Sequence, residues 1–74
     1  MKFDVHLKDV EVFEDEEFGR GFDFHREWYE AIELLPNKTQ KFNLFHMINT
    51  YFFDNKLPEN DNSSEYKLFM EMLG

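Results

Sequence analysis

The sequence predicts a small α+β fold in which a short N-terminal antiparallel β ribbon precedes three helices. Three observations support this: alternating apolar and β-branched residues before residue 13, helical periodicity after residue 23, and fourteen aromatic residues among 74. We expect one domain, residues 1–74, with the ribbon and an acidic loop in 1–23 and the helical part in 24–74. A chain this short buries only roughly 60% of its unfolded surface, so its large aromatic side chains must supply much of the core.

Residues 3–13 alternate apolar and polar side chains, and the parity of the alternation changes between Leu7 and Val10. This change indicates either a β-bulge or a tight turn at Lys8-Asp9. Phe3, Leu7 and Val10 also fit a helical spacing, but the β-branched valines favour a strand. Glycines at positions 19 and 21 mark a turn, and residues 18–24 are long enough for a short return strand.

The first helix is predicted for residues 24–35. Asp23 is a good N-cap residue, and the helix must end at Leu35 because the residue before Pro36 avoids the α region. Its apolar residues recur at helical spacing and form one stripe. They are Phe24, Trp28, Ile32 and Leu35.

The second helix, residues 38–53, is predicted to form the centre of the core. Asn37 is a suitable N-cap, and Gln40 can complete a capping box. One broad apolar face is expected. It comprises Leu44, Phe45, Met47, Ile48, Tyr51 and Phe52. After a polar loop, Asn62 or Ser63 is expected to cap a third helix with an apolar face that includes Phe69 and Met72.

The charge of the chain is negative and unevenly placed. Residues 1–35 contain eleven acidic and four basic residues, a net charge of −7, whereas residues 36–74 carry −1. A nucleic-acid backbone would be repelled by the first half, while a basic protein surface would be attracted. We therefore expect a protein partner and no direct contact with nucleic acid.

Catalytic motifs are not found in the sequence. There is no cysteine, the three histidines are far apart, the two serines are better explained as helix caps, and no glycine-rich loop precedes a helix. We expect a protein that is not an enzyme, with no metal and no cofactor. No apolar run approaches a membrane span, and the N-terminus is too charged for a signal peptide, so a cytoplasmic location is expected.

Two surfaces are candidates for partner binding. The first is centred on four consecutive acids flanked by phenylalanines, which would anchor the charged patch on a basic groove. Its residues are Glu11, Phe13, Glu14, Asp15, Glu16, Glu17, Phe18, Glu27 and Glu30. The second consists of aromatic residues that lie off the main apolar stripes: Tyr29, Phe42 and Phe53. The alternative for the acidic run is a solvated loop that serves solubility alone, and for the aromatic residues it is packing under other elements.

A helix-loop-helix pattern also runs through the second part of the chain. It contains Tyr29-Glu30-Ala31-Ile32, two further residues, and then Leu35-Pro36; Gln40, Tyr51, Asp54-Asn55 and Leu57-Pro58 follow. With this pattern, residues 24–72 resemble a family of uncharacterised domains from phages and prophages of Gram-positive bacteria. These domains often head proteins associated with phage replication or its regulation. Asn55 stands where the family usually has glycine, and Asn also tolerates the left-handed conformation.

Together these features predict a phage-type protein that binds and inhibits a host nucleic-acid-handling or defence protein. The acidic surface would act as a mimic of the phosphate backbone in the host cytoplasm. The alternative is an accessory or regulatory module of phage DNA replication or transcription, which assembles with a larger basic partner or as a homodimer.

Overall fold

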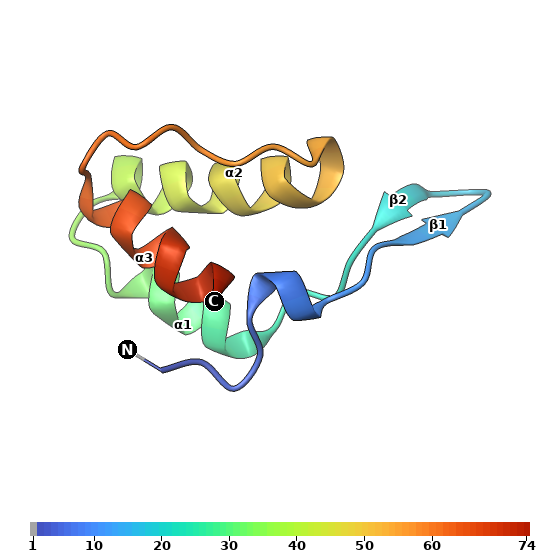
Figure 1. Ribbon diagram of the computed structural model, residues 1–74, viewed down its shortest axis with the longest axis horizontal. Helices are drawn as coiled ribbons and strands as arrows, with labels where there is room; N and C mark the ends of the chain where they lie inside the picture. The colour runs from blue at the N-terminus through green and yellow to red at the C-terminus, as the bar shows by residue number, and fades with distance from the viewer. Residues whose placement is uncertain (1) are drawn as a thin grey trace.

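Three helices enclose one hydrophobic core, and a β hairpin projects from one end of the molecule (Figure 1). The computed structural model describes residues 2–74, with dimensions of 37 × 23 × 20 Å. The elements in chain order are the 3₁₀ helix η1 (Leu7–Asp9), strands β1 (Phe13–Asp15) and β2 (Gly19–Gly21), and helices α1 (Arg26–Glu33), α2 (Lys38–Asp54) and α3 (Ser64–Leu73). The predicted α+β arrangement, a two-stranded antiparallel ribbon followed by three helices, is confirmed.

The long helix α2 forms as its sequence predicts. The side chain of Asn37 accepts a hydrogen bond from the backbone N–H of Gln40 at 2.9 Å, which satisfies one of the free donors of the first turn. The Gln40 side chain accepts from the Asn37 side-chain amide at 2.9 Å, so the expected capping box is replaced by a side-chain pair. The helix ends at Asn55, a left-handed residue with φ of 53°.

The residues immediately before α1 are not helical, so the prediction of a helix starting at Phe24 with an Asp23 cap is wrong. The helix starts at Arg26, and His25 is its N-cap residue. Aromatic contacts explain the later start: the ring of Phe22 stacks on that of Phe52, with 4.0 Å between centroids, and the ring of Phe24 stacks on a residue of α2. These tertiary contacts outweigh the local preference of Asp23 for the cap.

Helix α3 is capped by Ser63, whose hydroxyl accepts from the N–H of Tyr66 at 3.1 Å. This settles the alternative between Asn62 and Ser63. The carboxylate of Glu65, in the first turn, is buried between α2 and α3 and accepts hydrogen bonds from the side chains of Asn43 (3.0 Å) and Gln40 (3.4 Å). The bond from Asn43 is the main cause that lowers the pKa of Glu65. The contact therefore fixes α3 against the first half of α2.

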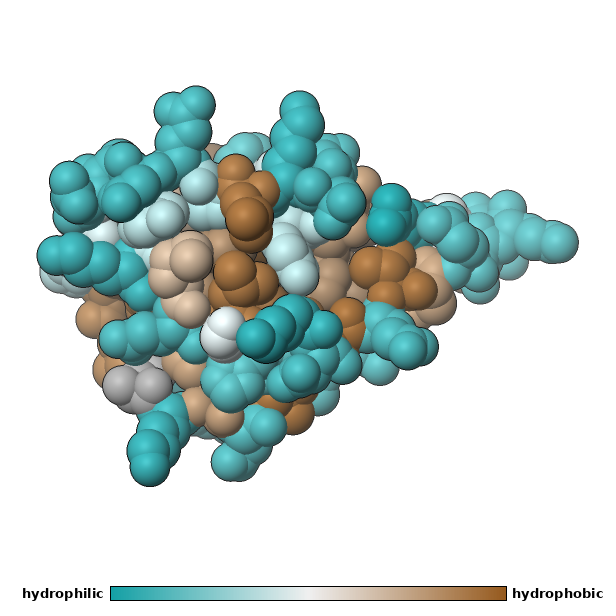
Figure 2. All heavy atoms as spheres, in the orientation of Figure 1, coloured by the Kyte–Doolittle hydropathy of each residue, from teal (hydrophilic) through white to brown (hydrophobic). Residues whose placement is uncertain are grey.

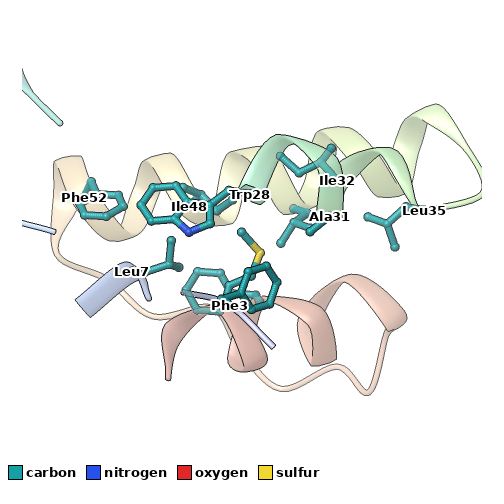
Figure 3. Close-up of a cluster of buried hydrophobic side chains, with 11 residues drawn as sticks. Phe3, Leu7, Trp28, Ala31, Ile32, Leu35, Ile48 and Phe52 are labelled. Carbon is teal, nitrogen blue, oxygen red and sulfur yellow. The ribbon is translucent and has the colours of Figure 1, made fainter. Parts of the chain in front are cut away.

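The core combines the helices with the N-terminal segment. Figure 3 shows side chains of α1 and α2 converging with Phe3 and Leu7 on one cluster. Its largest fully buried member is Trp28, whose indole N–H donates to the carbonyl oxygen of Val5 at 3.0 Å. On α2 the buried residues are Leu44, Ile48 and Phe52. The prediction that Phe45 also belongs to the buried face is wrong, because this side chain is 43% exposed.

The N-terminal segment is not a strand before residue 13, so the preference for a strand over residues 3–13 is wrong for all but Phe13. Residue 1 lies outside the described residues. The parity change reflects the 3₁₀ turn Leu7–Asp9, whose period is three residues. The backbone finds its partners on α1 and not on another strand: Glu27 accepts hydrogen bonds from the N–H groups of Asp4 and Val5. The return strand is likewise shorter than predicted and covers Gly19–Gly21.

Candidate functional site

The acidic residues of the first candidate surface lie on the β1–β2 hairpin. Its strands pair with Phe13 opposite Gly21, Glu14 opposite Arg20 and Asp15 opposite Gly19. Every residue from 13 to 20 is exposed, and Figure 2 shows the hairpin as a narrow arm with a hydrophilic outer part. The hairpin therefore offers its side chains to a partner from several sides.

The turn of the hairpin is built by one of its own acidic residues. The Asp15 carboxylate accepts hydrogen bonds from the N–H groups of Phe18 (2.9 Å) and Glu17 (2.8 Å), and these bonds lower the pKa of Asp15. Gly19, the first residue of β2, follows with φ of 84°, a left-handed conformation that glycine adopts without strain. Asp15 is thus a structural residue of the turn as well as a charge at the tip.

Glu14, Glu16 and Glu17 supply the remaining charge of the hairpin. Glu14 lies 3.8 Å from the guanidinium of Arg20 on the opposite strand, a solvated contact that contributes little. Within residues 2–74, no hydrogen bond or ion pair engages the side-chain carboxylates of Glu16 and Glu17. These two carboxylates are consequently available for a cationic partner.

Two phenylalanines flank the acidic residues, as the sequence suggests, and they differ in their surroundings. Phe18, at the turn, is 83% exposed. Phe13 is 51% exposed and covers its cross-strand neighbour: a Cβ on Gly21 would lie 2.8 Å from the Phe13 ring. The glycine therefore allows the Phe13 ring to lie close against the opposite strand, while the Phe18 ring is almost fully exposed.

The other acidic residues of the first candidate surface lie apart from the tip. Glu11 is exposed in the segment that leads into β1. Glu27 and Glu30 lie on α1, and both engage groups of the same molecule: Glu27 binds the backbone of Asp4 and Val5, and Glu30 pairs with Arg26 at 3.2 Å. The structure thus brings together residues 13–18, and it places Glu27 and Glu30 elsewhere.

A second set of exposed side chains, which we call the aromatic face, comes from α2, α1 and the segment before α1. Its residues are Phe24, Tyr29, Phe42, Phe45 and Phe53. The sequence pattern indicates three of them but not Phe24 and Phe45, because both fit the apolar stripes of the predicted helices. The i, i+3 spacing of Phe42 and Phe45 was the available signal, since it places both rings on one side of a helix.

Other kinds of site are not found in the described part of the chain. Residues 2–74 contain no pocket and no group of three or more potential metal ligands. The histidines are separated: His6 lies beside Asp9, His25 caps α1, and His46 stacks on Phe42. None of the described helices combines the length and apolarity that crossing a membrane requires.

Comparison with known proteins adds no relative. No protein-family model matches the chain, and neither a curated protein nor a solved structure shows significant similarity to it.

Proposed function

We propose that this protein is a binding protein without catalytic activity, and that its acidic hairpin engages a basic surface on another protein. The single observation that carries this proposal is the hairpin itself: a projecting arm, residues 13–20, with every side chain exposed and two carboxylates at the tip free of internal partners. A loop whose role is only to connect two elements does not need an ordered, protruding ribbon of this kind.

The chemistry of the partner follows from the charge. Carboxylates spaced along a narrow ribbon present a row of negative charge, the pattern that a protein groove for a phosphate backbone is built to bind. We infer that the partner is a nucleic-acid-handling or defence protein of a bacterial host, and that the hairpin inhibits it by occupying this groove. The resemblance of residues 24–72 to phage and prophage domains favours a phage origin.

The hairpin is suited both to rapid encounter with a basic surface and to slow dissociation from it. Exposed carboxylates mainly increase the rate of encounter with a basic surface, whereas a buried aromatic anchor slows dissociation. Phe18 is the candidate anchor, since its ring is the most exposed of the large apolar side chains. The turn is already ordered by Asp15 and Gly19, so little conformational freedom would be lost on binding.

The proposal is tested by reversing the two unpaired charges. We expect Glu16→Lys with Glu17→Lys to abolish capture of the partner from a lysate of a Gram-positive bacterium at about 0.15 M salt. Asp15 is left unchanged because it builds the turn. Asp4→Lys with Glu59→Lys is the matched control, since it changes the net charge equally at exposed positions outside the hairpin. Captured proteins are identified by mass spectrometry.

The proteins captured by three baits are compared: the parent chain, the hairpin variant and the control variant. Proteins retained by the parent and the control, but lost from the hairpin variant and released by salt, are the partners that the proposal expects. Loss of nucleic-acid binding by such a protein on addition of the parent chain tests the inhibitory role. Identical proteins on all three baits would assign the acidic run to solubility alone.

The second candidate function is an accessory module of phage replication or transcription. The observation that favours it is the aromatic face, which is separate from the acidic tip and apolar in character. A partner that is phage-encoded, and that is lost on substitution of Phe42 but not of Glu16 and Glu17, would support this function over the first.

A further inference from the structure

We propose that the aromatic face is the contact between two copies of this chain, which pair through their α2 helices about a twofold axis. This inference goes beyond the binding function proposed for the hairpin and does not depend on it. Four properties of the aromatic face support this contact: the continuity of its rings, its charge, its area, and the way it fits a second copy of itself.

Ring contacts link three residues of the face, Phe24, Phe45 and Phe53, across the segment before α1 and helix α2. Phe24 stacks on Phe45 at 5.8 Å, and Phe22 joins Phe24 (6.3 Å) to Phe53 (5.6 Å). Phe42 lies one turn before Phe45 on the same side of α2 and is 68% exposed. An apolar helix surface of this kind is normally covered in a folded protein.

Tyr29 extends the face onto α1. Glu33, one turn further along α1, lies 3.5 Å from the ammonium group of Lys41 on α2. Because residues four apart share one side of a helix, Tyr29 lies on the side of α1 that borders α2. Its ring is exposed.

The charge of α2 identifies the face as the place where two copies can meet. Helix α2, Lys38–Asp54, contains two lysines and one acidic residue, Asp54 at its C-terminal end, in a chain with sixteen acids and a net charge of −8. Two such molecules repel each other over most of their surfaces. A contact between the two α2 helices avoids placing acids against acids, and it has the aromatic composition found at interface centres.

The area is also in the range that a small dimer needs. At exposures of 38% to 68%, the five rings offer on the order of 500 Å² of aromatic surface per copy. A standard interface takes about 800 Å² from each partner, so these rings provide more than half of it. Pairing also buries further apolar surface for a domain whose core is near the lower limit of size.

The face matches itself when α2 is paired in antiparallel orientation. A twofold axis that crosses α2 between Met47 and Ile48 places Phe42 of one copy near Phe53 of the other, because these two residues are equally distant from that point of the helix. The same axis places the end of α2 that carries Lys38 beside the C-terminal end of the opposite α2. Positive side chains are favoured there by the helix dipole.

The test is sedimentation equilibrium of the full chain as a function of concentration and salt. We expect a dimer at concentrations on the order of 100 μM, since interfaces of this size without charge attraction bind weakly. Raising the salt from about 0.05 to 0.5 M tightens the dimer by screening the repulsion between two negative molecules. Raising the salt concentration weakens binding of a basic partner through the acidic hairpin, so the salt dependence distinguishes the two proposals.

Phe42→Glu is the test variant and Phe18→Glu is the matched control. Both replace an exposed phenylalanine by the same charge, and circular dichroism is used to check that each variant remains folded. Phe42→Glu should weaken dimerisation about 100-fold, because a twofold contact contains the change twice. Phe18→Glu should leave it unchanged.

Three results would overturn the proposal. The first is a parent chain that stays monomeric up to concentrations on the order of 1 mM. The second is a dimer that is lost with Phe18→Glu and kept with Phe42→Glu, which would place the contact on the hairpin. The third is growth to larger assemblies with concentration, because a twofold contact closes at two copies.

Discussion

The hairpin and helix α2 both carry phenylalanines, yet they are held in place by different kinds of force. The hairpin is ordered by contacts within nine residues: the Asp15 carboxylate on the turn, Gly19 in the left-handed region, and the Phe13 ring on Gly21. Helix α2 is held by contacts with α1, α3 and the hairpin base, far apart in the sequence. Changes in the helical part should therefore act on the whole fold, whereas changes in the hairpin should act on recognition.

The two regions meet at the base of the hairpin. Val10, Val12 and Phe22 are partly buried against the core, and the Arg20 guanidinium donates to the carbonyl oxygen of Phe53 at 3.5 Å. Beyond these residues the hairpin has only its own contacts. The boundary between the two kinds of stabilisation thus lies between Val12 and Phe13 on one strand and at Arg20 on the other, because Arg20 still contacts α2.

The largest effect is expected from Trp28→Ala. This change removes the largest fully buried side chain and leaves the carbonyl of Val5 without its donor, so the free energy of unfolding should fall by about 3–5 kcal/mol. That loss is most of the stability of a domain of this size. Urea denaturation measures it, and Trp28→Phe, which keeps most of the apolar volume, should lose less. A parent-like midpoint for Trp28→Ala would show that the helical part is not one cooperative core.

A smaller effect is expected on the pH dependence of stability. Hydrogen bonds from the N–H groups of Val5 and Asp4 lower the pKa of Glu27 below its usual 4.5. A group with a lowered folded-state pKa stabilises the fold above its unfolded pKa, and this contribution is lost as the pH falls through the folded value. Stability should therefore decline as the pH drops below about 4.5. Glu65, lowered chiefly by Asn43, acts in the same direction.

Glu27→Gln isolates the first of these contributions. The amide cannot ionise, so urea midpoints measured from pH 6 down to pH 3 should decline less steeply than in the parent, because part of the proton uptake on unfolding is removed. Glu30→Gln is the control, since its carboxylate pairs only with the exposed Arg26. If the urea midpoints of the parent and Glu27→Gln declined equally between pH 6 and pH 3, the Glu27 carboxylate would not be what holds the N-terminal segment against α1.

The smallest effect on stability is expected in the hairpin. Phe18→Ala should change the free energy of unfolding by no more than about 0.5 kcal/mol, because the ring is 83% exposed and packs on no other element. Gly21→Ala should be nearly as mild for the whole fold, since the Phe13 ring that it displaces is free to move. It should nevertheless abolish the ring-current shift of the residue 21 Hα proton in NMR spectra. A loss of more than about 1 kcal/mol in Phe18→Ala would show that the hairpin folds back on the core.

The elements that the sequence predicted well are those with strong local signals. Asn37 and Ser63 cap their helices as expected, because a side-chain oxygen near the free N–H groups of a first turn needs no distant partner. The glycines at positions 19 and 21 correctly indicated a turn and a return strand, although this strand is shorter than predicted. On the hairpin, residues 13–18 are grouped in space because they are neighbours in the chain.

Tertiary contacts decided the remaining features. The N-terminal segment takes its hydrogen bonds from Glu27 and Trp28, more than twenty residues away, so its apolar alternation was a misleading sign of a strand. Phe24 and Phe45 have the spacing of core residues, but they stack on each other at the surface. Periodicity tells which residues share one side of an element, whereas the packing of the other elements determines whether that side is covered. The acidic tip could therefore be predicted from the sequence, whereas the aromatic face could be predicted only in part, at Tyr29, Phe42 and Phe53.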